Sequence, residues 1–168
     1  IGEYAFSNCN ISALSLPESL ETIGSHAFYG NSIATLSIPN SVKKLEGYAF
    51  AFCKNLSEVT IGNSLEVIGY YAFSGCSNLS KVTIGNKVKT IEQSAFNQCT
   101  LLSSIVWGES LLVIEDDAFS SCSSLTSITL PNTLVSIDYK AFALSGLTSI
   151  NIPSSVAKIG TQAFSGCY

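Results

Sequence analysis

Residues 68–90 read IGYYAFSGCSNLSKVTIGNKVKT, and the chain repeats this pattern from end to end. The Ala-Phe dipeptide of this segment recurs in steps of 22 or 23 residues, at Phe6, Phe28, Phe50, Phe73, Phe96, Phe119, Phe142 and Phe164. A fixed step of this size is typical of repeat proteins, in which each repeat is one supersecondary unit. The chain is therefore predicted to be an array of stacked units.

Each unit carries the same order of apolar positions. Cys follows Phe by three residues in six units, and Asn31 or Ser145 takes its place in the other two. The next segment, L-x-x-[VIL]-x-[IL], has the period of two that predicts a short strand with one buried face, and Pro or Gly ends it. A V-x-x-I segment (88–91) predicts a second short extended piece, and the Ala-Phe-x-x-Cys spacing predicts a single helical turn. One unit cannot bury these faces alone, so the units share one core, with parallel strands about 4.8 Å apart.

The strand pattern at this period resembles a leucine-rich repeat, and the signature I-G-x-x-A-F-x-x-C is similar to that of the BspA-like subclass of surface and secreted proteins from bacteria and some protists. The resemblance covers residues 1–168. It implies a right-handed leucine-rich-repeat solenoid of the α/β type, made mostly of short parallel strands with turns and single helical turns. It also implies an inward Asn/Cys ladder at the Cys position.

The chain holds about seven units of 22–23 residues plus a partial one, and both ends fall inside a unit. Solenoids need polar caps over their terminal cores. We therefore expect residues 1–168 to form a single solenoid domain that is an internal slice of a longer array.

Composition argues against two classes of partner. Eight Lys, no Arg and a net charge of −4 do not provide the basic footprint of a nucleic-acid binder. No apolar run approaches the roughly 20 residues of a spanning helix, so we expect no membrane insertion by this segment. Charged residues are only 12% of the chain, whereas it has 28 Ser and 11 Thr, so its polar surface is predicted to be mostly hydroxyl.

No metal or cofactor site is expected. The six cysteines recur once per unit, where stacked Cβ vectors do not suit a disulfide, so we expect buried free thiols and keep paired cysteines as the alternative. An acidic cluster could offer oxygen ligands to Ca²⁺, although a solvated acidic edge is the favoured interpretation. The cluster consists of Glu92, Glu115, Asp116, Asp117 and Asp138.

The residue before Ala-Phe forms the first candidate binding surface. This position varies along the array and is expected to be exposed, and in four successive units it is Tyr4, His26, Tyr48 and Tyr71. Tyrosine is a favoured contact residue, so these rings are expected to line up along the rod, with Phe52 as a nearby exposed apolar group. The alternative is that the rings only pack on each other.

The outward face of the L-x-x-I-x-I strands is the second candidate binding surface. It is a hydroxyl ladder with an expected cross-strand pair between Glu58 and Lys81, and it suits a glycan or an extended polypeptide. The candidate contact residues are Thr35, Thr60, Lys81, Thr83 and Thr129. The alternative is that Thr and Ser only keep the sheet soluble.

These features favour a non-enzymatic recognition module that binds an unidentified protein or glycan ligand. The resemblance implies a cell-surface or secreted location and adhesion-type binding of host or matrix proteins. The alternative function is a structural scaffold or spacer within a large assembly. An enzyme is disfavoured, because one His and no Arg leave few groups that could stabilise a transition state.

Overall fold

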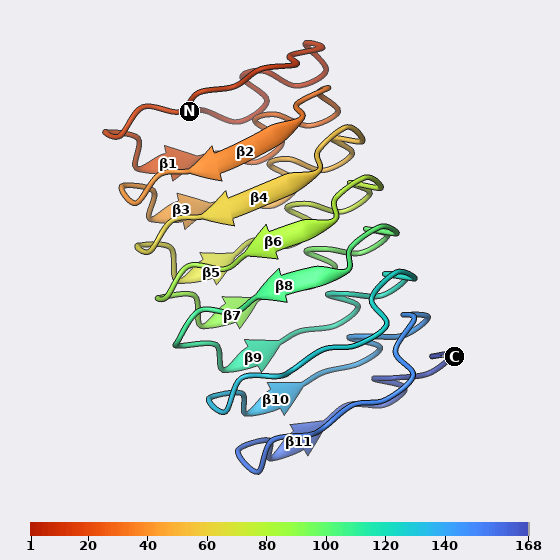
Figure 1. Cartoon of the computed structure of the whole chain (residues 1–168). Helices are drawn as coiled ribbons and strands as arrows, with labels where there is room; N and C mark the ends of the chain where they lie inside the picture. Colours follow the sequence, from red (N-terminus) through yellow and green to blue (C-terminus); the bar gives the residue numbers. More distant parts are fainter. Residues whose placement is uncertain (168) are drawn as a thin grey trace.

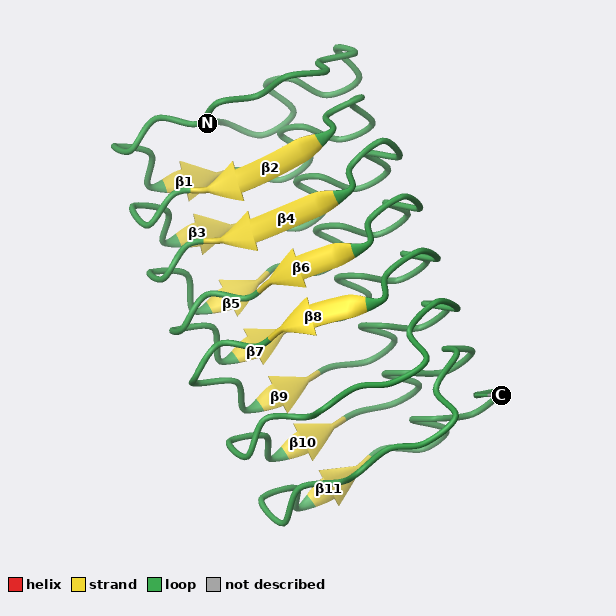
Figure 2. Ribbon diagram, viewed as in Figure 1, coloured by secondary structure: helices red, strands yellow, loops and turns green. Residues whose placement is uncertain are grey.

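Two stacks of short parallel strands run along the molecule, which is a parallel β-solenoid (Figure 1). The computed structural model describes residues 1–167, which contain no helix (Figure 2). The seven-stranded sheet contains β1 (Thr22–Ile23), β3 (Lys44–Leu45), β5 (Val67–Ile68), β7 (Thr90–Ile91), β9 (Val113–Ile114), β10 (Ser136–Ile137) and β11 (Lys158–Ile159). The four-stranded sheet contains β2 (Thr35–Ile38), β4 (Glu58–Ile61), β6 (Lys81–Thr83) and β8 (Ser104–Val106).

The strands of the four-stranded sheet alternate between solvent and core, as their period of two predicts. In β2, Thr35 faces solvent whereas Leu36 and Ile38 are buried. Each residue pairs with its equivalent one unit later, as Leu36 does with Val59. Equivalent residues of successive units therefore form columns along the solenoid, so a column can be read directly from the repeat alignment.

The phenylalanines of the Ala-Phe dipeptides form the centre of the core. Successive rings stack nearly parallel, with centroids 5.1 to 5.7 Å apart. The six inner rings are at most 1% exposed; they are Phe28, Phe50, Phe73, Phe96, Phe119 and Phe142. The predicted shared core is confirmed, and each unit buries its ring against the rings of its neighbours rather than within itself.

The segment around Ala-Phe is a series of turns and not the expected helical turn. The residue before Ala-Phe has a φ between 53° and 58° in all eight units, and the residue four positions later has a φ between 55° and 72°. Positive φ breaks a right-handed helix. It also turns amides toward the next unit, so that Phe28 N–H donates to the carbonyl oxygen of Ala49 at 2.8 Å. The turns thereby continue the hydrogen-bonded stacking of the sheets.

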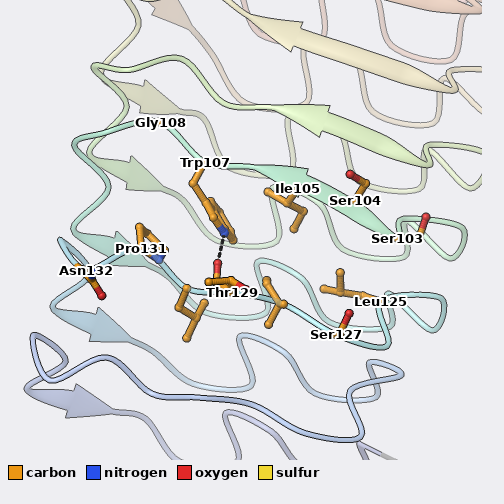
Figure 3. A pocket seen from close by; sticks show the side chains of 12 residues that line it. Ser103, Ser104, Ile105, Trp107, Gly108, Leu125, Ser127, Thr129, Pro131 and Asn132 are labelled. Atoms are coloured by element: carbon orange, nitrogen blue, oxygen red, sulfur yellow. Dashed lines mark hydrogen bonds between the residues drawn. The ribbon is translucent and has the colours of Figure 1, made fainter.

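The four-stranded sheet stops at β8, although the following unit has the same strand pattern. Trp107 stands in the column that holds Ile38, Ile61 and Ile84 in the preceding units. Its indole lies edge-on to Phe119 at 5.9 Å, and its Nε1–H donates to the carbonyl oxygen of Thr129 at 2.8 Å (Figure 3). A hollow of 680 Å³ opens between β8 and the next unit. We attribute this gap to the indole, which is larger than the isoleucine side chain it replaces.

Candidate binding surfaces

The four aromatic residues before Ala-Phe form one continuous stack, which we call the aromatic column. The ring centroids of Tyr4 and His26 are 4.6 Å apart, those of His26 and Tyr48 4.6 Å, and those of Tyr48 and Tyr71 4.7 Å. The interplanar angles are 18°, 12° and 4°. The predicted alignment is thus confirmed.

The aromatic column is less exposed than its variability suggested. Tyr4 is 55% exposed, but His26, Tyr48 and Tyr71 are half-buried, because each ring covers its neighbours. Burial and the neighbouring tyrosines raise the pKa of Tyr48 above its ordinary value. The phenol of Tyr48 therefore stays neutral and retains its hydroxyl proton as a hydrogen-bond donor.

Phe52 is exposed, as predicted. Its ring is tilted against Tyr29 at 5.5 Å and lies over Gly75, where an added Cβ would come within 2.6 Å of it. Phe52 occupies the second positive-φ position of its turn, and in three other units this position is a glycine, namely Gly30, Gly75 and Gly166. Glycine adopts positive φ readily, so these glycines indicate a left-handed backbone position. The prediction of a helical turn did not take this signal into account.

The hydroxyl ladder is present along β2, β4 and β6 but does not reach Thr129. Thr60 pairs in register with Thr83, and Thr35 pairs with Glu58. Lys81 lies directly opposite Glu58, but the ion pairs among residues 1–167 do not include these two. Thr129 lies beyond the gap after β8, where its strand pairing is limited to an isolated bridge with Asn151.

The aromatic column and the hydroxyl ladder lie on different sides of the solenoid. Figure 1 shows β2, β4, β6 and β8 in front, and the turns that follow β1, β3, β5 and β7 behind them. His26, Tyr48 and Tyr71 belong to these turns, Tyr4 belongs to the equivalent turn of the first unit, and the six inner phenylalanines are buried. The two candidate surfaces are therefore two separate sites.

The acidic side chains connect neighbouring units. Glu92 Oε2 accepts a hydrogen bond from the backbone N–H of Tyr70 at 2.9 Å, and Glu115 Oε2 accepts one from Gln93 N–H at 3.2 Å. Asp138 accepts hydrogen bonds from Lys158 Nζ and from Ser136 Oγ, both at 2.7 Å. Within residues 1–167, no group of three or more His, Cys, Asp or Glu is placed to hold a metal ion. These bonds give the carboxylates a structural role.

All six cysteines are free thiols, as expected, but four of them are buried, whereas Cys9 is exposed and Cys167 is half-buried in the end units. Each buried thiol donates to the phenylalanine carbonyl oxygen of the preceding unit, as Cys76 does to Phe50 at 3.2 Å. Asn31 occupies the same position and donates to the carbonyl oxygens of Phe6 and Phe28 at 2.7 and 2.8 Å. Burial raises the pKa of Cys53 to about 11 and that of Cys122 to about 12, so these thiols are poor nucleophiles.

A hollow of 550 Å³ beside β3 and β5 was missed at the sequence level. Tyr70 lines this hollow and is 46% exposed. The column of Tyr70 holds Ser25, Gly47, Tyr70 and Gln93 in successive units. The sequence signal for this hollow is Gly47, which stands one unit before Tyr70 in the same column and leaves room beside the ring.

No helix within residues 1–167 has the length and apolar character that crossing a bilayer requires.

Similar solved structures are bacterial leucine-rich repeat proteins. One from Eubacterium ventriosum is 26% identical with a TM-score of 0.76, and the match covers 98% of this chain and 39% of that protein. The T. pallidum leucine-rich repeat protein is 28% identical with a TM-score of 0.67, over 80% of this chain and 77% of that one. A leucine-rich cell surface protein from Faecalibacterium prausnitzii is 29% identical with a TM-score of 0.55, over 80% of this chain and 45% of that one.

A search of curated proteins finds no match. The family model of the BspA type leucine rich repeat region matches residues 1–101 and 48–168, which together span the chain. The observed solenoid, with its 22–23-residue units and stacked phenylalanines, has the architecture that such repeats require. The chain therefore belongs to the BspA-type leucine-rich repeat family.

Proposed function

We propose that the chain is a non-enzymatic recognition module of a cell-surface or secreted protein, and that it binds a protein or glycan partner through an extended face of the solenoid. The observation that carries this proposal is the aromatic column, in which four rings stack at 4.6 to 4.7 Å across successive units. The cell-surface location is supported by one similar protein, which is described as a leucine-rich cell surface protein.

The physics of the aromatic column suits adhesion-type binding. Tyrosine offers a large contact area with few rotatable bonds and a polar tip, and such residues often supply most of the binding energy of an interface. Stacking orders the rings before a partner arrives, which lowers the entropic cost of binding. The hydroxyl ladder with Thr35, Thr60, Lys81 and Thr83 adds polar contacts on the other side, and a longer array would add avidity.

The nucleophilic and acidic groups support a non-catalytic role. The thiols at the centre of the array donate to backbone oxygens, and burial raises the pKa of Cys76 and Cys99 well above the ordinary value. The carboxylates of Glu46 and Glu92 hold backbone amides of the preceding unit. Catalysis needs a group that is poised for proton transfer or attack, whereas these groups are engaged in holding the units together.

A binding assay with a matched pair of variants tests the proposal. Tyr48→Ser and Tyr71→Ser are combined, because Ser94 already occupies this position with a φ of 55° and shows that serine fits the backbone. The control combines Lys140→Ser and Gln162→Ser in the same column. The probes are immobilised purified matrix proteins and glycans, and the readout is the dissociation constant.

We expect wild type and the control to bind at least one probe, and the tyrosine double variant to bind it at least about ten-fold more weakly, the loss that results when interface anchors are truncated. Equal binding by both double variants would refute the role of the aromatic column. If no probe binds and the chain co-purifies with a filament or assembly of its source instead, the scaffold function replaces recognition.

A further inference from the structure

The hollow beside Tyr70 has the composition of a small-ligand site. Its volume of 550 Å³ falls within the usual range for ligand pockets. Its walls combine an aromatic ring and aliphatic surface with fixed polar groups. The lining residues that matter here are Lys44, Leu45, Glu46, Val67, Tyr70 and Glu92.

The ring of Tyr70 is held in one orientation. An added Cβ at Gly47 would fall 2.4 to 2.6 Å from three ring carbons, so the ring lies directly against this glycine. Its edge contacts Tyr48 at 5.6 Å and Tyr71 at 6.4 Å, both at 88°. A ring that is fixed on these sides and is still 46% exposed is a preorganised platform for an apolar face of a ligand.

Two carboxylates beside the ring are fixed as well. Glu92 Oε2 accepts from the N–H of Tyr70 at 2.9 Å, and no other residue within 1–167 bonds to Oε1 of Glu92. Glu46 Oε2 accepts from Ser25 N–H at 2.9 Å, and its other oxygen pairs with Lys44. The hollow therefore presents one unused carboxylate oxygen and one ammonium group at defined positions around the ring.

The charges around the hollow are mostly paired. Lys44 pairs with Glu46, and two further ion pairs join Lys43 to Glu21 and Lys89 to Glu66. This pairing leaves Glu92 as the one lining carboxylate without a cationic partner among the described residues. A strongly cationic ligand would find few free counter-charges, which favours a neutral ligand that has both an apolar face and hydroxyl groups.

We infer that the hollow binds a sugar residue of a neutral glycan. The C–H face of the sugar packs on the Tyr70 ring, one hydroxyl donates to Glu92 Oε1, and another accepts from Lys44 Nζ. No bond is made or broken in this binding. The inference rests on the glycan alternative of the proposed function and deepens it, because it places the sugar in the hollow and not on the aromatic column or the hydroxyl ladder.

Saturation-transfer NMR with a panel of neutral mono- and disaccharides tests the inference on wild type, Tyr70→Ala and Tyr139→Ala. Tyr139 is the matched control, because it occupies the same column and is 40% exposed. The residue of this column in the preceding unit is Gly47 for Tyr70 but Asp116 for Tyr139. We expect saturation transfer to at least one saccharide with wild type and the control, and at least about five-fold weaker binding with Tyr70→Ala, as the loss of one aromatic contact implies. Circular dichroism checks that all three proteins are folded.

Glu92→Gln separates a sugar from a cationic partner, with a lysine oligopeptide as the second probe. Glutamine keeps an oxygen that can accept from Tyr70 N–H, so sugar binding should fall less in Glu92→Gln than in Tyr70→Ala. Peptide binding that is lost with Glu92→Gln, in the absence of saccharide binding, would overturn the inference in favour of a cationic partner. Saccharide binding that is absent from wild type, or unchanged in Tyr70→Ala, would also overturn it. The aromatic column is judged separately on the matrix-protein probes, because Tyr48 and Tyr71 also contact the Tyr70 ring and their loss would disturb a sugar in the hollow.

Discussion

Replacing Trp107 by isoleucine tests why the four-stranded sheet stops at β8. The preceding units have isoleucine in this column, and their strands pair in continuous register. If the indole holds the strands apart, Trp107→Ile lets the next unit join the sheet. Residues Ser127, Ile128 and Thr129 would then pair with Ser104, Ile105 and Val106 in the repeat register.

The expected gain is local. Extending the sheet by three residues adds two or three backbone hydrogen bonds, each with a net value of about 1 kcal/mol. The free energy of local opening should therefore rise by about 2 kcal/mol, which slows hydrogen exchange of the affected amides roughly 30-fold. Global stability should change less, because the variant also loses the hydrogen bond from Trp107 Nε1 to Thr129, a loss of about 1 kcal/mol.

Amide hydrogen exchange of residues 127–129, followed by NMR, measures this effect. Trp107→Phe is the control, because it keeps an aromatic ring beside Phe119 but removes the N–H donor. We expect slow exchange in Trp107→Ile and fast exchange in Trp107→Phe. If Trp107→Ile exchanges at the wild-type rate, the indole is not what separates the strands. If Trp107→Phe is also protected, the hydrogen bond to Thr129 matters more than the size of the ring.

Three further predictions follow from the buried and charged groups. Phe96→Ala should lower the free energy of unfolding by about 3–5 kcal/mol in a denaturant titration, because it leaves a cavity between two stacked rings; a loss below about 1 kcal/mol would contradict the shared core. At pH 8 only Cys9 and Cys167 of the folded chain should react quickly with a disulfide reagent, because the other four thiols are buried and burial raises their pKa. All six cysteines should react after unfolding, and a third fast thiol in the folded chain would show that the core opens. Burial and the neighbouring carboxylates raise the pKa of Glu115, so its negative charge opposes folding, and Glu115→Gln should have a higher free energy of unfolding than wild type at pH 7. This advantage should disappear as the pH falls below 4.5, where the carboxyl group is protonated in both states; an advantage that persists in acid would have another origin.

The sequence was sufficient to predict the features that repeat. The step of 22 or 23 residues placed the phenylalanines in one buried stack, and the period of two identified the exposed residues of β2 and β4. The stacking of Tyr4, His26 and Tyr48 followed from the same alignment, because equivalent residues of parallel strands are neighbours. These predictions succeed because stacking converts distance along the chain into distance along the solenoid.

Backbone conformation and contacts between columns could not be read in this way. The position before Ala-Phe contains no glycine or asparagine in any unit, so nothing in its composition indicates the positive φ that His26 and Tyr48 adopt. The bond from Tyr70 N–H to Glu92 joins two columns, and residue alternation does not predict such a bond. The acidic side chains were expected to face solvent, whereas several of them hold backbone amides.

The candidate sites lie where a column changes its residue type. A column that repeats one residue produces an even surface or an even core, as the stacked phenylalanines do. Gly47 followed by Tyr70 produces a hollow with an aromatic wall, and Trp107 after a run of isoleucines opens a gap. The aromatic column likewise ends where Ser94 replaces tyrosine. Since each change affects only adjacent units, a long array of this kind can acquire several independent sites without altering its core.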